Sequence, residues 1–493
     1  MTDVLGGLEP KPVWQHFEKL CAIPRPSKKE AKAAAHVLSL ARSWGLRAWQ
    51  DQVGNVLVAK PATPGMENRR TAVLQAHLDM VPQRAAESTH DFERDPIEPR
   101  VDGAAVRANG TTLGADNGIG VATALAVLQS RDLAHGPLEA LFTVDEETGM
   151  SGANGLKQGQ LHGDLLLNLD SEDEGEICIG CAGGGDLKAE LKLTERAVAK
   201  GSMALRVAVA GLKGGHSGVD IHLGRGNANK VLARVLGAVR RELPLRLARF
   251  SGGNLRNAIP RSAEAVIVVA AKDGERAQQL IAAITKDVKT ELLAVDPDLS
   301  VGAEKARAPA KALSKSDSDR VLDVLLACPH GVFAMVRDMP TVTETSNNLA
   351  IVELAKGVLR AHCMFRSSVD SKKTDVAESL RAIFELVGAK ISVFGGYPGW
   401  TPDVRSKLLA VCQDVYAAKF GTKPKITATH GGLECGIIRA AYPHMEAVSI
   451  GPTIRYPHSP DEHVDIASVG RFWTYLAEIL RQVPVANGAH RAV

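Results

Sequence analysis

Three apolar runs that each end in acidic side chains restrict the fold of this chain more than any other feature. They cover residues 71–79, 138–147 and 164–172, with the sequences TAVLQAHLD, LEALFTVDEE and DLLLNLDSE. Apolar runs of this length are typical of strands buried on both faces, which occur in sheets covered by helices. Open sheets of this kind bind ligands at the carboxyl ends of their strands. We therefore predict an α/β domain whose central strands carry acidic residues at that edge.

Helical patterns surround these strands, as an α/β fold requires. Ser27 is predicted to be the N-cap of a helix that ends at Gly45. A further strand is predicted at 446–450, before the last helix. The helices predicted in these parts of the chain cover 13–23, 27–45, 115–130, 403–420 and 463–482.

The pattern changes from about residue 186. Long amphipathic helices alternate there with strands, which is typical of a separate α+β layer. A chain of 493 residues is also too long for one hydrophobic core. Glycine, proline and aromatic residues at 391–400 indicate the point where the chain crosses back. We therefore predict an α/β domain made of 1–185 and 397–493, with an α+β domain inserted at 186–396.

Composition argues against several classes of partner. The formal net charge is +3, and the basic stretch at 239–250 has no aromatic or glycine-rich nucleic-acid signature beside it. No run approaches the roughly 18 apolar residues of a membrane span, and the N-terminus has no apolar signal segment. Seven scattered cysteines fit a reducing compartment better than a disulfide framework. We therefore expect a cytoplasmic protein that binds neither nucleic acid nor membrane.

His77 and Asp79 stand two positions apart at the end of the first run, so an extended backbone points both to the same side. Histidine ligands of metal ions are commonly oriented by a carboxylate. The alternative is coincidence, because a chain of this length contains several H-x-D patterns. The pair by itself leaves both interpretations open.

Asp116, Glu146 and Glu147 are ambiguous in the same way. Asp116 precedes an apolar helical run between flexible glycines, a place that also suits an ordinary N-cap. Glu146 and Glu147 are adjacent at a strand end, and neighbouring carboxylates repel unless a cation or a proton separates them. One of them can then bind a metal while the other acts as a base. The alternative for this pair is a solvated acidic turn.

Asp170 and His458 complete the set of candidate ligands. Asp170 directly follows the third strand, whereas the acids of 172–176 are expected to form a solvated loop. His458 lies between two prolines that rigidify its loop. Histidine and carboxylate ligands without a thiolate suit a borderline divalent ion, Zn²⁺ above all, with Mn²⁺ or Co²⁺ as alternatives. Cys178 and Cys181 fall within a predicted strand, which argues against a redox pair.

These motifs together resemble the M20 metallopeptidases, and within them the aminoacyl-histidine dipeptidases. The resemblance covers essentially the whole chain, through HLDM, GTTLGADNGIG, DEETGMSGA, GCAGG, GGHSGVDIHLGRGNANK, RNAIPR, HGGLECG and HSPDEHV. It implies a zinc-peptidase-like α/β catalytic domain, with helices on both faces of a central mixed sheet, and an inserted α+β lid domain. It also implies hydrolysis of unblocked dipeptides, including Xaa-His and carnosine, with a related tripeptidase or aminoacylase as the alternative.

The resemblance also implies two Zn²⁺ ions per subunit, bridged by Asp116. His77 and Asp170 would complete one metal site. Glu147 and His458 would complete the other. We see no departure from the family pattern at these positions.

Two further catalytic roles follow from the resemblance. Asp79 would orient His77, and Glu146 would be the general base that takes a proton from the attacking water. In the lid, His216 would act in the active site of a partner subunit, which implies a homodimer that is formed through the lid domains. The alternative is a glycine-flanked surface histidine.

Three further residues resemble substrate-binding positions of the family: two in the lid, Asn257 and Arg366, which would bind the C-terminal carboxylate of the substrate, and one, Gly432, in the second part of the catalytic domain. A guanidinium fork suits the C-terminal carboxylate of a peptide. Gly432 resembles a backbone contact.

Overall fold

The computed structural model describes residues 4–486 and divides into two compact units. The first unit contains Met1–Gly180, Pro402–Ala428 and Leu433–Val493, and the second contains Cys181–Thr401 and Thr429–Gly432. Within the described part of the chain, no helix combines the length and the apolar character that a membrane crossing needs. We describe each unit by itself.

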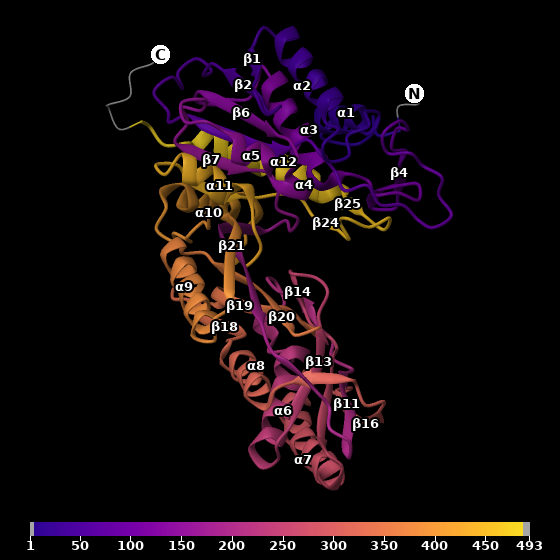
Figure 1. Cartoon of the computed structure of the whole chain (residues 1–493). Coiled ribbons are helices and arrows are strands. Elements are labelled where there is room, and N and C mark those ends of the chain that lie inside the picture. The colour runs from indigo at the N-terminus through magenta and orange to yellow at the C-terminus, as the bar shows by residue number, and fades with distance from the viewer. Residues whose placement is uncertain (1–3, 487–493) are drawn as a thin grey trace. The chain divides into compact units, whose positions relative to one another are not determined.

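A mixed eight-stranded sheet forms the centre of the first unit (Figure 1). Its three central strands β6, β3 and β7 run parallel, and β23 continues this parallel set, whereas β1 and β2 are antiparallel at one edge. In order across the sheet the strands are β1 (Arg47–Gln50), β2 (Val56–Lys60), β6 (Leu138–Thr143), β3 (Ala72–His77), β7 (Leu165–Asn168), β23 (Glu446–Ser449), β8 (Glu176–Cys181) and β22 (Lys425–Thr429).

Helices cover both faces of this sheet. Every residue of β3, β6 and β7 is buried, and because successive residues of a strand point to opposite faces, neither face of these strands is open to solvent. Helix α3 packs on β3, α2 on β2, and α10 and α11 on β23. The helices of the first unit are α1 (Lys11–Cys21), α2 (Ala31–Ser43), α3 (Ala115–Gln129), α4 (Glu146–Gly149), α5 (Ser151–Gly155), α10 (Lys407–Phe420), α11 (Glu434–Ala441) and α12 (Ile466–Gln482).

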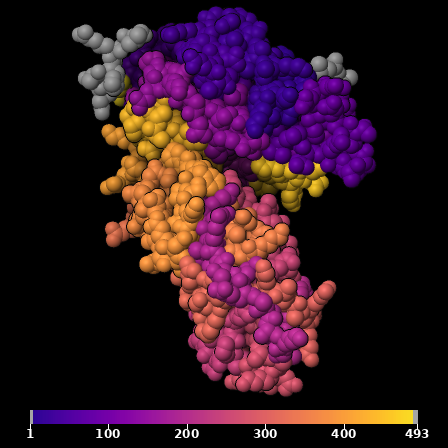
Figure 2. Space-filling model, in the orientation of Figure 1, coloured from indigo at the N-terminus to yellow at the C-terminus, as the bar shows by residue number. Residues whose placement is uncertain are grey.

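The C-terminal segment is an integral part of the first unit. Strand β23 lies between β7 and β8, so residues near 446 complete a sheet that begins near residue 47. Figure 2 shows the yellow C-terminal residues among the purple residues of the first 150. A small sheet also joins the two segments, and its strands are β24 (Ile454–Arg455), β25 (His463–Asp465), β5 (Ala105–Ala108) and β4 (Pro99–Asp102).

The second unit is built on an antiparallel sheet with helices along one face (Figure 1). In sheet order its strands are β16 (Ser300–Ala306), β11 (Ser202–Ala210), β15 (Ala263–Ala270), β13 (Arg246–Gly252), β19 (Met339–Ala355), β20 (Val358–Ser367), β9 (Gly183–Lys192) and β21 (Lys390–Tyr397), and β18 (Gly331–Val336) pairs with β19. The four helices are α6 (Ala228–Glu242), α7 (Gly274–Leu292), α8 (Lys315–Ala327) and α9 (Asp370–Leu386).

One core joins these helices to the sheet of the second unit. It contains alternate residues of the strands, such as Leu205, Val207 and Val209 of β11, and the apolar stripes of the four helices. This alternation is expected where one face of an antiparallel sheet is packed and the other is open. Two short pairs complete the unit, β10 (Glu195–Ala197) with β17 (Lys311–Leu313) and β12 (Gly215–His216) with β14 (Ala258–Ile259).

The predicted fold class is confirmed: one unit is α/β with a mixed, helix-covered sheet, and the other is α+β. Two local predictions are wrong. Helix α2 begins at Ala31, and the Ser27 hydroxyl donates instead to Asp79 Oδ2 at 2.8 Å. Residues 463–465 are strand β25, because they pair with β5 before the last helix begins. In the segment 391–400, where the crossing was predicted, residues up to Tyr397 belong to β21, and the second unit ends just after it at Thr401.

Candidate active site

His77 ends β3 and is held by the carboxylate of Asp79. His77 is 1% exposed, and its Nδ1 lies 3.4 Å from Asp79 Oδ1. The same carboxylate accepts hydrogen bonds from the backbone N–H groups of Glu146, at 3.0 Å, and Glu147, at 3.1 Å. Burial opposes ionisation of Asp79, but hydrogen bonds from His77, Ser27 and the backbone outweigh it and lower its pKa to about 2. Asp79 therefore joins the end of β3 to the turn after β6.

The other ring nitrogen of His77 faces two carboxylates. Its Nε2 lies 3.1 Å from Asp116 Oδ1 and 3.2 Å from Asp170 Oδ1. Asp170 Oδ1 is buried and forms no directed hydrogen bond with a described residue, although it is this close to the ring. Burial raises the pKa of Asp170 to about 6. A single ring N–H cannot donate to both carboxylates. The lone pairs of the ring nitrogen and of the two carboxylate oxygens therefore point toward one common position.

Asp116 is shared between two histidines. Its second oxygen, Oδ2, lies 3.2 Å from His458 Nε2, and His458 Nε2 also lies 3.0 Å from Glu147 Oε2. Hydrogen bonds to Asp116 and Glu147 raise the pKa of His458 to about 11. A second group of three converging ligand atoms is thereby formed by Asp116, Glu147 and His458.

Glu146 lies at the edge of these two groups. Its carboxylate, that of Glu147 and the His77 ring offer ligand atoms within 4.8 Å of one another. Burial raises the pKa of Glu146 well above its ordinary value, and the neighbouring charges of Asp170, Glu434 and Glu147 raise it further against the effect of His77. The carboxyl group is therefore poised to take up a proton.

The cluster has an excess of negative charge. Five carboxylates meet two imidazoles, and no lysine or arginine between residues 4 and 486 forms an ion pair with any of the five. Buried charges of one sign need a cation, a proton or both. The donor set, with an Asp170 oxygen that has no directed hydrogen bond, therefore fits two divalent ions that share one carboxylate. The carboxylates are those of Asp79, Asp116, Glu146, Glu147 and Asp170.

The four remaining candidates lie in the second unit. Arg366 is 4% exposed, donates to the Tyr397 hydroxyl at 3.0 Å, and forms no ion pair with an acidic side chain in the described chain. Gly432 also lies beside Tyr397, because a Cβ added to this glycine would stand 3.0 Å from the ring. Burial, together with the charge of Arg366, lowers the pKa of His216. His216 pairs with Ala258 across β12 and β14.

Comparison with known proteins reveals the family. The family model described as peptidase family M20/M25/M40 matches residues 73–482. The chain belongs to this family. This M20 peptidase is 47% identical over 480 residues, 97% of its length and 99% of the relative's, to the cytosol non-specific dipeptidase of Escherichia coli.

Solved structures agree with this assignment. The aminoacylhistidine dipeptidase of Vibrio alginolyticus superposes with a TM-score of 0.94 at 46% identity, over 98% of each chain. Aminopeptidase PepT of Bacillus cereus superposes with a TM-score of 0.55 at 15% identity, over 97% of this chain and 99% of the PepT chain. At this identity the likeness supports the fold alone. The resemblance predicted from the motifs is confirmed. Peptidases of this family depend on metal ions, and the described residues contain groups that could hold them.

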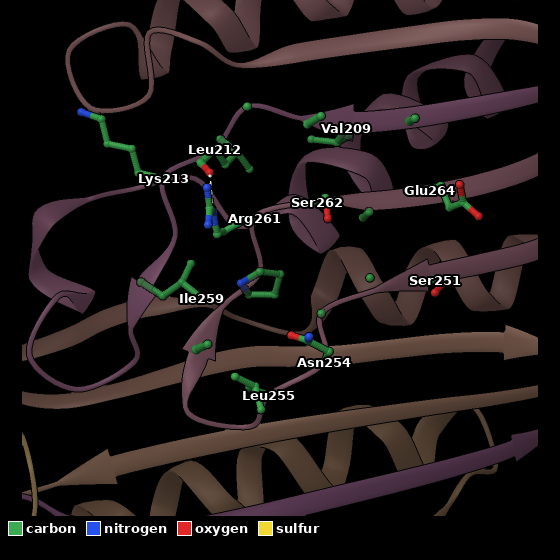
Figure 3. Close-up of a pocket in the computed structure, with 18 of the residues that line it drawn as sticks. Val209, Leu212, Lys213, Ser251, Asn254, Leu255, Ile259, Arg261, Ser262 and Glu264 are labelled. Carbon is green, nitrogen blue, oxygen red and sulfur yellow. Dashed lines mark hydrogen bonds between the residues drawn. The ribbon is translucent and has the colours of Figure 1, made fainter. Parts of the chain in front are cut away.

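A hollow of about 980 Å³ opens in the second unit of the peptidase (Figure 3). Its walls include the segment 208–213, just before His216, and the segment 251–255, just before Asn257. Asn257 is exposed, and its carbonyl accepts from the Ser217 N–H at 2.8 Å. In Figure 3, Arg261 donates to the Leu212 carbonyl at 3.3 Å. The two loops with His216 and Asn257 are therefore joined to each other and border open space.

The sequence reasoning missed three buried ionisable residues beside the cluster. Glu434 Oε2 accepts from Gln75 Nε2 at 2.6 Å and from Thr143 Oγ1 at 2.7 Å, and burial raises its pKa to about 8. Arg25 and Glu462, each 2% exposed, hold the backbone around Asp116. The only sequence signal for Glu462 was its place in HSPDEHV.

The prediction of a solvated acidic loop at 172–176 is wrong in part. Glu174 accepts hydrogen bonds from the Tyr416 hydroxyl at 2.6 Å and from Arg471 Nη2 at 2.9 Å. Glu172 is partly buried, and burial, with the charges of Asp116 and Asp170, raises its pKa to about 8. Glu172 and Glu174 therefore pack against the rest of the first unit instead of being fully solvated.

Proposed function

We propose that this peptidase is a dipeptidase with two bound Zn²⁺ ions, which hydrolyses unblocked dipeptides, including aminoacyl-histidine dipeptides such as carnosine. One observation carries the proposal: the two oxygens of Asp116 face two different imidazoles, of His77 at 3.1 Å and of His458 at 3.2 Å. The two similar proteins are a non-specific dipeptidase and an aminoacylhistidine dipeptidase, which supports the substrate class.

In this proposal Asp116 would help to hold both ions, through one oxygen each. His77 and Asp170 would hold one of them, and Glu147 and His458 would hold the other; with Asp116, these residues match two of the three groups whose ligand atoms lie within 4.8 Å of one another. Zn²⁺ suits this set of imidazole and carboxylate ligands, and Mn²⁺ or Co²⁺ are alternatives. Bound divalent ions make a water molecule acidic enough to lose a proton near neutral pH, and they polarise a peptide carbonyl.

Glu146 is the proposed general base. Its carboxylate takes a proton from the attacking water and then delivers it to the leaving amine. Burial is the main cause that raises the pKa of Glu146, and a higher pKa makes its carboxylate a stronger base. Asp79 orients His77 and also fixes the backbone of Glu146 through the 3.0 Å hydrogen bond to its N–H. One carboxylate thus sets the positions of a ligand and of the base.

We assign the α/β part, 1–185 and 397–493, as the catalytic domain and 186–396 as the lid. In the lid, Arg366 is the proposed site for the C-terminal carboxylate of the dipeptide, because it is buried without an acidic partner in the described chain. Asn257 and Gly432 are further proposed contacts with the substrate. His216 is proposed to reach the active site of a partner subunit in a homodimer that forms through the lids. The name of the Escherichia coli relative supports a cytosolic location.

A substrate panel on metal-stripped enzyme tests this function. The stripped protein is reloaded with Zn²⁺, Mn²⁺ or Co²⁺ and assayed with Xaa-His and other dipeptides, tripeptides and N-acetyl amino acids, while bound metal is counted by mass spectrometry. We expect two ions per chain and the highest kcat/KM for free dipeptides. Fast cleavage of N-acetyl amino acids with inert dipeptides would identify an aminoacylase instead, and a preference for tripeptides would identify a tripeptidase.

A matched pair of variants tests the bridging role. Asp116→Asn should reduce the metal content of both sites, because each oxygen of Asp116 serves one of them. Asp132→Asn removes the same charge from an exposed position of the same unit and should leave the metal content unchanged. Equal metal content in the two variants would contradict the shared carboxylate.

A further inference from the structure

Glu462 is a buried carboxylate that lies outside the proposed ligand set. It is 2% exposed, although it comes from a loop near the C-terminus. Its Oε2 accepts from the N–H groups of Leu113, at 2.8 Å, and Gly114, at 3.0 Å. Its Oε1 accepts from those of Ala115, at 2.7 Å, and Asp116, at 3.2 Å. Four successive backbone donors at the start of α3 therefore share one carboxylate.

Arg25 holds the same turn from its carbonyl side. Its Nη2 donates to the Gly114 carbonyl at 2.6 Å, and its Nη1 donates to the carbonyls of Leu78 and Asp79, both at 3.0 Å. The guanidinium stands so close that a Cβ at Gly114 would lie 2.6 Å from Nη2, and Gly114 has a φ of +70°. Only glycine fits there without strain. The turn before Asp116 is thus fixed between two buried, opposite charges.

We propose that Glu462 is a positioning residue for Asp116, and that its four backbone hydrogen bonds fix the direction in which the two Asp116 oxygens point. The reason is geometric. A ligand that serves two ions must hold both oxygens to within roughly 0.5 Å, and a short side chain such as aspartate has little freedom to correct a displaced backbone. This inference rests on the proposed metal site and adds a residue that sets its affinity.

A purely structural role is the competing explanation. A carboxylate at a helix N-terminus stabilises that helix through its orphan N–H groups and its dipole. Removal of a cap of this kind would lower the melting temperature by the same amount in the metal-free and the metal-loaded protein. A positioning residue, in contrast, changes the affinity for the metal, so the two roles separate when both states are measured.

Glu462→Gln is the first variant for the test. It keeps the size of the side chain, but its amide NH₂ must face two of the four N–H donors, so two hydrogen bonds are lost and two donors repel it. We expect the dissociation constant for Co²⁺ or Zn²⁺, measured by chelator competition, to rise about 10- to 100-fold, the usual effect of removing a partner of a metal ligand. The metal-induced rise in melting temperature should shrink in parallel.

Asp461→Asn is the matched control. Asp461 is the neighbouring acid, its side chain is exposed, and the variant removes the same charge. It should bind metal as the wild type does. Glu462→Asp keeps the charge but withdraws the carboxylate by one methylene, so its affinity should fall between those of the wild type and Glu462→Gln.

The outcomes separate the two proposals. A wild-type chain that binds no divalent ion would overturn the proposed metal site itself. A wild-type chain that binds two ions, with Glu462→Gln binding them as tightly, would overturn only the role of Glu462. Equal losses of melting temperature in the free and loaded states, with unchanged affinity, would identify Glu462 as a simple cap.

Hydrogen exchange on the wild-type protein gives a second test that needs no variant. The amides of 113–116 donate to Glu462 rather than to a metal ligand, so we expect them to be protected in metal-stripped protein as well as in metal-loaded protein. If these amides exchange as fast as those of an open loop and become protected only when metal is added, Glu462 does not hold the turn, and the proposal is wrong.

Discussion

Asp79 and Glu146 are joined by a 3.0 Å hydrogen bond from the Glu146 backbone N–H to Asp79 Oδ1. The same oxygen lies 3.4 Å from His77 Nδ1. The carboxylate that orients a candidate metal ligand therefore also holds the backbone of the candidate base. Strands β3 and β6 are parallel neighbours, which brings their two carboxyl ends to the same edge of the sheet.

Glu146→Gln should abolish most turnover while the metal content stays near that of the wild type. The amide cannot accept the proton, and a general base typically contributes a factor of roughly 10² to 10⁴. The measurement is kcat for a dipeptide alongside the number of bound ions. Glu147→Gln serves as the comparison, because it should lose metal as well. Unchanged turnover in Glu146→Gln would rule out the proposed base.

Asp79→Asn should lower both metal affinity and kcat. Asp79 now faces the His77 ring and accepts hydrogen bonds from the N–H groups of Glu146 and Glu147. The NH₂ group of an asparagine at this position would be placed against one of these donors. The expected loss in affinity is about 10- to 100-fold. Chelator competition and steady-state kinetics measure the two effects, and a loss confined to kcat would argue that Asp79 does not orient His77.

Subunit mixing tests the cross-subunit role of His216. Homodimers of His216→Ala and of Glu146→Ala should each be nearly inactive, whereas a mixture should recover part of the activity, because one site of the heterodimer is intact. Subunit exchange is verified independently, for example by native mass spectrometry of tagged chains. If exchange is complete and no activity returns, His216 acts within its own chain or has no catalytic role.

Arg366→Lys should raise KM for free dipeptides about 10- to 100-fold, because hydrogen bonds to a charged group contribute roughly 1.5–3 kcal/mol and an ammonium cannot form a fork. Dipeptide amides, which lack the carboxylate, should show a much smaller change. Arg360→Lys is the control, since Arg360 is exposed and lies on the same strand. An equal loss for free dipeptides and amides would place the carboxylate elsewhere.

His16 should make the first unit less stable at acidic pH. Burial lowers its pKa to about 4, against 6.5 for the free side chain, and its Nε2 lies 2.7 Å from Gln129 Oε1. Because the unfolded chain binds the proton more tightly, the free energy of unfolding falls as the pH decreases from about 6.5 to about 4, by up to about 3 kcal/mol. Above that range both states are neutral and the effect vanishes.

The measurement is denaturant unfolding of wild type and His16→Gln at pH 7.5 and pH 5, followed by a probe in the first unit. The difference in unfolding free energy between the two proteins should change with pH in the direction given above. His444→Gln, at an exposed position, should leave the pH dependence unchanged. A parallel pH dependence for wild type and His16→Gln would contradict the prediction.

Long-range contacts give two residues a role that their local sequence does not indicate. Ser27 fits the pattern of an N-cap, but its hydroxyl donates to Asp79, 52 residues later. Glu462 looks like one more loop acid, yet its partners are backbone groups almost 350 residues earlier. A local sequence pattern predicts only the hydrogen bonds that residues close in sequence can form. It therefore cannot predict these long-range hydrogen bonds.

The sequence by itself determined the fold class and named as candidate ligands all five side chains of the two groups that share Asp116. This was possible because strand burial follows from local hydrophobic pattern and because strand ends in such sheets face a common edge. Only the tertiary structure shows that His77 and His458 face the two oxygens of Asp116, and the proposed ligand role of Asp116 rests on this relation. The physical reason is that a binding site is a relation among distances, and His458 lies 342 residues beyond Asp116. The packing of α3, β3 and the C-terminal segment sets those distances, and no single segment contains them.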